Sequence, residues 1–99
     1  MPKPFLDLSF EEFADLATRF PWTRRVTEVH LHHTFRPDHA DFAAKPPAQS
    51  IEGMFRFHTE TRGFRDIAQH VTVDPTGRIW TGRHFNDPPA SATGFNGNA

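Results

Sequence analysis

The sequence predicts an α/β fold in which helices flank a mixed β-sheet. Residues 26–34 (VTEVHLHHT) and 67–73 (IAQHVTV) alternate with the period of two that is typical of strands. Residues 50–63 between them have helical spacing, and a turn followed by RIWTGR brings the chain back as a hairpin. A strand, a helix and a strand in succession normally form a right-handed crossover. We therefore expect residues 26–34 to lie parallel to a strand of the hairpin, in the same sheet.

Length and composition limit the class of protein. The 99 residues suffice for one domain, and 11 Phe and 2 Trp provide a modest hydrophobic core. A net charge of −1 gives no basic field for a phosphate backbone, so we expect no nucleic-acid partner. No apolar run is long enough to span a membrane, and residues 1–13 show no secretory signal. Since the chain has no Cys, it contains neither disulfides nor thiolate metal ligands.

The first predicted element is a helix within residues 1–25, a region that we expect to form an N-terminal capping helix and a linker. Ser9 and Glu12 have the S-x-x-E spacing of a capping box, in which each side chain pairs with a free backbone N–H. Pro21 ends the helix. Its apolar stripe, which we expect to face the core, consists of Phe10, Phe13, Leu16, Ala17 and Phe20.

Residues 26–99 are expected to form the main part of the domain, beginning with the strand at 26–34. Residues 35–49 hold three prolines and no sustained period, which predicts a long loop. Ser50 is the predicted N-cap of a second helix that ends near Gly63. The apolar positions of this helix are Ile51, Met54, Phe55 and His58.

The strand at 67–73 leads into the turn Asp74-Pro75-Thr76-Gly77 and then into the returning strand. After Arg83 the chain is rich in Pro, Gly, Asn and Ala, and no further element is predicted. A three-stranded sheet would leave one edge and one face uncovered. We therefore expect the fold to be incomplete at its C-terminal side.

Seven histidines are the unusual feature of the composition. His30 and His32 lie on one face of the predicted strand, and imidazoles at this spacing can bind one Zn²⁺ if a third ligand is available. The remaining candidates for that ligand are His39, His58, His70, His84 and nearby carboxylates. We expect His58 and His70 to be hydrogen-bonded packing residues. Motifs of serine hydrolases, nucleotide-binding loops and H-E-x-x-H metalloproteases are absent from the sequence.

Three segments occur in an order that is specific in combination: VHLHHTFRP, then SIEGMFRFHTETRGFRDIAQHVTVDPTGRIWTGR, then PPASATGFNGN. Together they resemble the N-acetylmuramoyl-L-alanine amidase family, which includes phage endolysin amidases and peptidoglycan recognition proteins. The resemblance covers about residues 26–99. It implies an amidase-type fold and peptidoglycan as the partner.

The resemblance also implies a reaction and site residues. In this family a zinc-bound water attacks the amide between N-acetylmuramic acid and L-alanine, and the first His of the HHT motif is a zinc ligand, which corresponds to His32. Gln69 stands where many members have a Tyr that assists at the zinc-bound water, so Gln69 is the candidate catalytic position. Trp80, Arg83 and Asn96 are the candidate substrate-binding residues. The other zinc ligands of the family, and in some members a catalytic Glu, correspond to positions beyond Ala99.

Two alternatives stay open. A peptidoglycan-binding module without catalysis would account for the missing ligands and for Gln69. An unrelated protein could bind metal through His30, His32 and another local ligand, with help from oligomerisation. The leading hypothesis is the front part of a zinc-dependent peptidoglycan amidase.

Overall fold

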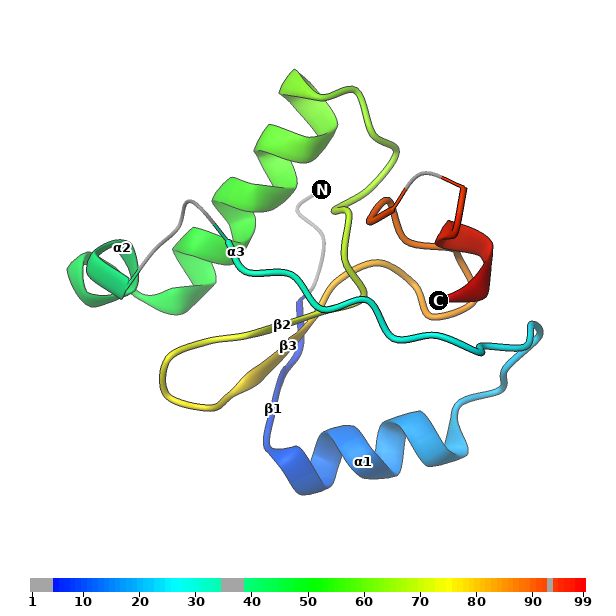
Figure 1. The fold of residues 1–99 in the computed structure, drawn as a ribbon. Coiled ribbons are helices and arrows are strands. Elements are labelled where there is room, and N and C mark those ends of the chain that lie inside the picture. Colours follow the sequence, from blue (N-terminus) through cyan, green and yellow to red (C-terminus); the bar gives the residue numbers. More distant parts are fainter. Residues whose placement is uncertain (1–4, 35–38, 93) are drawn as a thin grey trace.

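Three short strands form the sheet of the computed structural model, which describes residues 5–34, 39–92 and 94–99 (Figure 1). The strands are β1 (Asp7–Leu8), β2 (Val71–Val73) and β3 (Ile79–Thr81), in the order β1-β3-β2. Both pairs are antiparallel. A small domain that combines a sheet with a few helices is therefore confirmed, whereas the parallel strand of the predicted mixed sheet is not found among the described residues.

The predicted hairpin is confirmed as β2 and β3, although β2 is shorter than the predicted strand at 67–73. Val71 lies opposite Thr81, and Val73 lies opposite Ile79. At the turn, Gly77 has a φ of 87°, a value that favours glycine, and its N–H donates to the carbonyl of Asp74 over 3.0 Å. The local turn signal was sufficient because its hydrogen bonds lie within a few residues.

Gly82 extends the pairing of the hairpin beyond β3. Its N–H donates to the carbonyl of His70 over 2.7 Å, and the next N–H, of Arg83, donates to the carbonyl of Gln69 over 2.8 Å. A Cβ at position 82 would overlap the carbonyl oxygen of Gln69 and touch Ile67. Only glycine allows the two backbones to approach this closely.

The predicted strand at residues 26–34 is wrong, since this segment (cyan in Figure 1) has no strand partner among the described residues. The N–H groups of Thr27 and Glu28 both donate to the carbonyl of Asn98 instead. Val29 and Leu31, which would face the core of a sheet, are 90% and 94% exposed. Alternation favours a strand only where another strand and an apolar layer adjoin it. The position beside β3 is taken by β1, which the sequence did not predict.

The helix α1 (Phe10–Arg19) confirms the N-terminal prediction. The Ser9 N–H donates to Glu12 Oε1 over 2.9 Å, and the Glu12 N–H donates to Ser9 Oγ over 3.1 Å, which is a complete capping box. Figure 1 shows α1 at the end of the chain segment that contributes β1 to the sheet. Phe13 packs edge-on against Phe85, while Phe10 is exposed. Only part of the predicted stripe therefore faces other residues.

Helices α2 (His39–Ala44) and α3 (Pro47–Arg56) occupy much of the region predicted as a loop at 35–49. Residues 35–38 lie outside the described residues. Pro46 is the N-cap of α3 and Pro47 its first residue, because a fixed φ suits the first turn of a helix. Ser50 is therefore not the predicted cap but a buried residue inside α3, and its Oγ has no partner among the described residues. The π-helix η1 (Phe57–Thr61) continues α3 to near Gly63, as predicted.

The core lies between α3 and the hairpin. Ile51 and Ile67 are fully buried and pack with Met54 and Trp80. Phe5 and Phe55 cover this cluster and meet edge-to-face at 5.7 Å. The last element is a short 3₁₀ turn, η2 (Asn96–Asn98). No helix of the described residues is long and apolar enough to cross a membrane.

Candidate functional site

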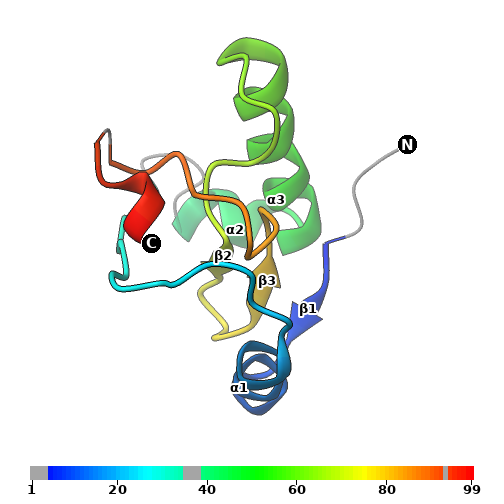
Figure 2. The same ribbon diagram turned by 90° about the vertical axis from the view of Figure 1, so that its right-hand side faces the viewer.

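The segment at 26–34, which carries the predicted zinc ligand, lies beside the C-terminal loop (Figure 2) and contacts it through one polar network. His30 Nδ1 lies 2.5 Å from Ser91 Oγ, and His30 Nε2 lies 3.0 Å from Glu28 Oε1. Asn96 holds Ser91 in place, because its Oδ1 accepts from the Ser91 N–H over 2.9 Å and from the Ala92 N–H over 2.7 Å. The predicted alternation put Glu28 and His30 on one face, but no sequence pattern pointed to Ser91, which is 61 residues away from His30.

His32 is exposed, and no hydrogen bond, ion pair or ring contact of its side chain occurs within residues 5–34, 39–92 and 94–99. Its ring is accessible to a ligand. His30, by contrast, uses both ring nitrogens inside the protein, so it does not form a ready metal pair with His32. No group of three His, Asp or Glu side chains that could bind a metal ion is found in the described part of the chain. These residues by themselves therefore do not fit a complete zinc site.

Gln69, the candidate catalytic position, is half-buried beside the hairpin. Its Nε2 donates to Thr72 Oγ1 over 2.9 Å and lies 3.6 Å from Met54 Sδ. The backbone carbonyl of Gln69 accepts from the backbone N–H of Arg83, so these two predicted site residues are neighbours. No hydrogen bond between Gln69 and His32 occurs among the described residues.

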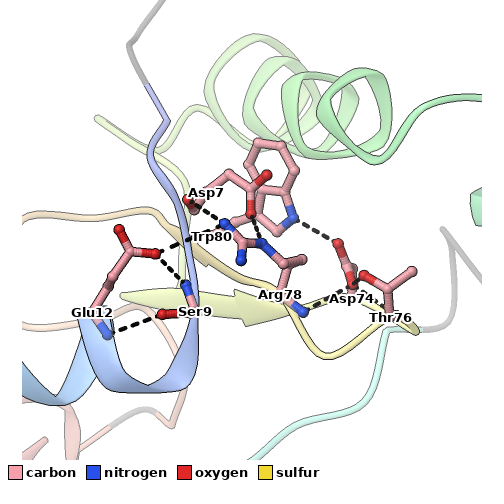
Figure 3. Close-up of polar contacts among 7 residues, drawn as sticks. All are labelled: Asp7, Ser9, Glu12, Asp74, Thr76, Arg78 and Trp80. Carbon is pink, nitrogen blue, oxygen red and sulfur yellow. Dashed lines mark hydrogen bonds and ion pairs between the residues drawn. The ribbon is translucent and has the colours of Figure 1, made fainter.

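Trp80 points inward from β3 instead of presenting a flat surface to solvent. It is 9% exposed, and its Nε1 donates to Asp74 Oδ2 over 2.9 Å. Figure 3 shows this contact as part of a network that starts at the turn. Asp74 Oδ1 also accepts from the Thr76 N–H over 2.8 Å and from the Arg78 N–H over 3.2 Å.

The same network reaches the N-terminal segment. Arg78 Nε donates to Asp7 Oδ1 over 2.6 Å, and its NH2 group lies 4.0 Å from Glu12 Oε1 (Figure 3). Side chains from the turn, from β1 and from the capping box of α1 thus meet at one place. The Asp-Pro-Thr-Gly turn was visible in the sequence, but its connection to Asp7, 71 residues away from Arg78, was not.

Arg83 is 7% exposed, and its guanidinium binds three backbone carbonyls. Its Nε donates to Ile67 O over 2.9 Å, its NH1 group to Pro88 O over 3.0 Å, and its NH2 group to Asp66 O over 3.3 Å. Burial lowers the pKa of Arg83, although Asp66 opposes this effect. In this arrangement the side chain of Arg83 connects the loop before β2 to the loop after β3.

Asn96 is the third candidate substrate-binding residue, and its oxygen is used within the chain. Trp80, Arg83 and Asn96 thus all direct polar atoms to partners in the protein. Trp80 and Arg83 are buried side chains that stabilise the hairpin and its flanking loops. The structure brings Gln69 close to Arg83, and Asn96 close to the segment that carries His32, but it does not assemble the five residues around one pocket of the described chain.

His58 and His70 are hydrogen-bonded packing residues, as predicted. His58 Nδ1 accepts from the Ala68 N–H over 3.0 Å, and His70 Nε2 lies 2.7 Å from the carbonyl of Asp87. Burial lowers the pKa of His58, and Arg62 and Arg83 add to this effect. Burial also lowers the pKa of His70, in spite of the opposing hydrogen bond to Asp87. Both imidazoles are therefore stabilised in the neutral form.

These shifts predict that the folded state becomes less stable in mild acid. Because the pKa of each ring is lower in the folded chain than in the unfolded chain, the unfolded state binds more protons as the pH falls below about 6.5. We expect the midpoint of urea unfolding to fall when the pH is lowered from about 7 to about 5. His58→Gln, which keeps an acceptor for Ala68, should show a shallower fall. An identical pH profile for this variant would contradict the role of His58.

Comparisons of the chain with family models, with curated proteins and with solved structures give no match. An exposed imidazole at position 32 and a polar network beside it are the features that can carry chemistry.

Proposed function

We propose that this chain is part of a zinc-dependent peptidoglycan amidase with an amidase-type fold, and that His32 is one of its zinc ligands. The reaction is hydrolysis of the amide bond between N-acetylmuramic acid and L-alanine. The observation that carries the proposal is the exposed His32 ring, without a partner among the described residues, inside the ordered set of motifs that resembles this family. An imidazole that is free of internal hydrogen bonds can bind zinc without giving up a partner in the fold.

The residues described here have separate tasks in this proposal. His32 offers one ligand, while Glu28, His30 and Ser91 fix the backbone next to it. Arg83 and Asp74 hold the hairpin and its flanking loops. Zinc with a complete ligand set supplies Lewis-acid activation of water and carbonyl. The remaining ligands have to come from outside the described residues, because these contain no complete set.

The test begins with the nucleotide sequence downstream of codon 99. We expect an in-frame continuation that encodes a further His and a Cys or Asp, and an immediate stop codon would contradict the proposal. In the complete gene product, His32→Ala should abolish zinc-dependent release of L-alanyl peptides from purified peptidoglycan. His33→Ala is the matched control, since the ring of His33 is also exposed but is not the proposed ligand. Equal activity of the two variants would reject the role of His32.

A second candidate function is peptidoglycan binding without catalysis. Gln69 favours it, because an amide cannot exchange a proton as a phenol does, and its Nε2 is already hydrogen-bonded to Thr72. Sedimentation with purified peptidoglycan in the presence of EDTA separates the two functions. Binding that persists in EDTA, without release of peptides when zinc is restored, would favour the binding module.

A further inference from the structure

Residues 28–32 pair with no strand of the described chain, although the N–H of Glu28 donates to the carbonyl of Asn98. Val29 and Leu31 are almost fully exposed, and at a spacing of two residues their side chains would share one face of an extended strand. No hydrogen bond to the backbone of either residue occurs among the described residues. Unpaired N–H and C=O groups beside exposed apolar side chains form a template to which another strand can bind.

The segment is complementary to itself. If two copies run antiparallel with His30 opposite His30, Val29 of each copy lies opposite Leu31 of the other, and Glu28 lies opposite His32. The first pair joins apolar side chains. The second joins a carboxylate with an imidazole N–H, which is a hydrogen-bonding pair. A shift of two residues in either direction loses the contact between Glu28 and His32.

We propose that residues 28–32 of two copies of this chain pair as antiparallel strands about a two-fold axis at His30. Backbone hydrogen bonds between Val29 of one copy and Leu31 of the other form the centre of the interface, using groups that are otherwise unpaired. The two-fold axis repeats every contact, as in other isologous dimers. The ring of His30 keeps its bonds to Glu28 and Ser91, since these lie within one copy.

The mass of the 99-residue chain in solution is the first test. Light scattering after size exclusion, with EDTA present so that no metal can bridge two copies, should give twice the mass of one chain. Leu31→Lys should give a monomer with an unchanged circular dichroism spectrum, because Leu31 contributes nothing to the core. Val73→Lys is the matched control on the exposed edge strand β2 and should remain dimeric. A monomeric wild type, or a dimer that Leu31→Lys does not change, would overturn the proposal.

Disulfide trapping tests the register, and the absence of native Cys gives a clean background. Opposite Cα atoms in such a pair lie about 5.5 Å apart, within the range of a disulfide, whereas diagonal positions lie about 7–8 Å apart. A mixture of Val29→Cys and Leu31→Cys chains should therefore oxidise to the mixed dimer severalfold faster than either variant forms its own dimer. Equal rates for mixed and identical pairs would reject the pairing at His30.

Discussion

Replacing Arg83 with alanine is expected to lower the free energy of unfolding by about 3 kcal/mol or more. The guanidinium donates to the carbonyls of Ile67, Pro88 and Asp66, and two of these three bonds are no longer than 3.0 Å. The variant would leave the buried carbonyl of Ile67 without this donor and a cavity in place of the side chain. Urea unfolding followed by tryptophan fluorescence measures the loss.

Arg65→Ala is the control for this prediction. Arg65 is a nearby arginine whose side chain is 67% exposed and whose ion pair with Asp87 is 3.5 Å long. Its removal should cost less than about 1 kcal/mol. A stable Arg83→Ala protein that has lost binding to peptidoglycan would instead identify Arg83 as a substrate-binding residue.

A second large loss of stability is expected for Asp74→Asn. Asp74 is 4% exposed and accepts hydrogen bonds from Trp80, from Thr76 and from the Arg78 N–H. An amide NH2 in place of one carboxylate oxygen would face a donor, which is expected to cost about 2–4 kcal/mol. Thermal unfolding monitored by circular dichroism is a suitable measurement.

The pH dependence of protein stability in acid is an independent test of the role of Asp74. Burial raises the pKa of this carboxyl, but hydrogen bonds from Thr76, Trp80 and the Arg78 N–H together outweigh burial and leave the pKa below its ordinary value. The stabilisation is therefore complete above about pH 4 and is lost as the pH falls further. Asp15→Asn changes an exposed carboxylate and should leave thermal stability within about 0.5 kcal/mol of wild type. Equal losses for the two variants would contradict the role of Asp74.

The parts of the fold that the sequence predicted correctly depend on interactions between near neighbours. The capping box of α1 joins residues three apart, and the hairpin turn joins Asp74 to Gly77 and Arg78. Such contacts join residues that are close in sequence, so a short sequence motif is enough to predict them. The end of the second helix near Gly63 was predictable for the same reason.

The errors concern elements that depend on distant partners. Residues 26–34 alternate like a strand, but pairing requires a neighbour, and β1 takes the position beside β3. A strand as short as Asp7–Leu8 has too few residues to show a period. Ser50 is a residue type that is preferred at N-caps, yet the prolines before it start the helix about one turn earlier.

The candidate site was predictable only in part. The predicted strand gave His32 a place on a polar face; the strand is wrong, but the ring of His32 is exposed. The inward course of Trp80 and Arg83 could not be predicted, because the partners of Arg83 are backbone carbonyls, which every residue has. The polar atoms of large buried side chains are hydrogen-bonded within the protein and are therefore not available to a ligand.

The pairing of β1 with β3 has a consequence for synthesis of the chain on the ribosome. Asp7 meets Trp80, and Leu8 meets Ile79, so β1 cannot pair until β3 has been translated. During that interval α1 can form through its own cap, but the sheet cannot. Residues 7–8 therefore leave the exit tunnel unpaired. Unpaired strands are prone to aggregation, so we expect a chaperone to act at this stage of synthesis.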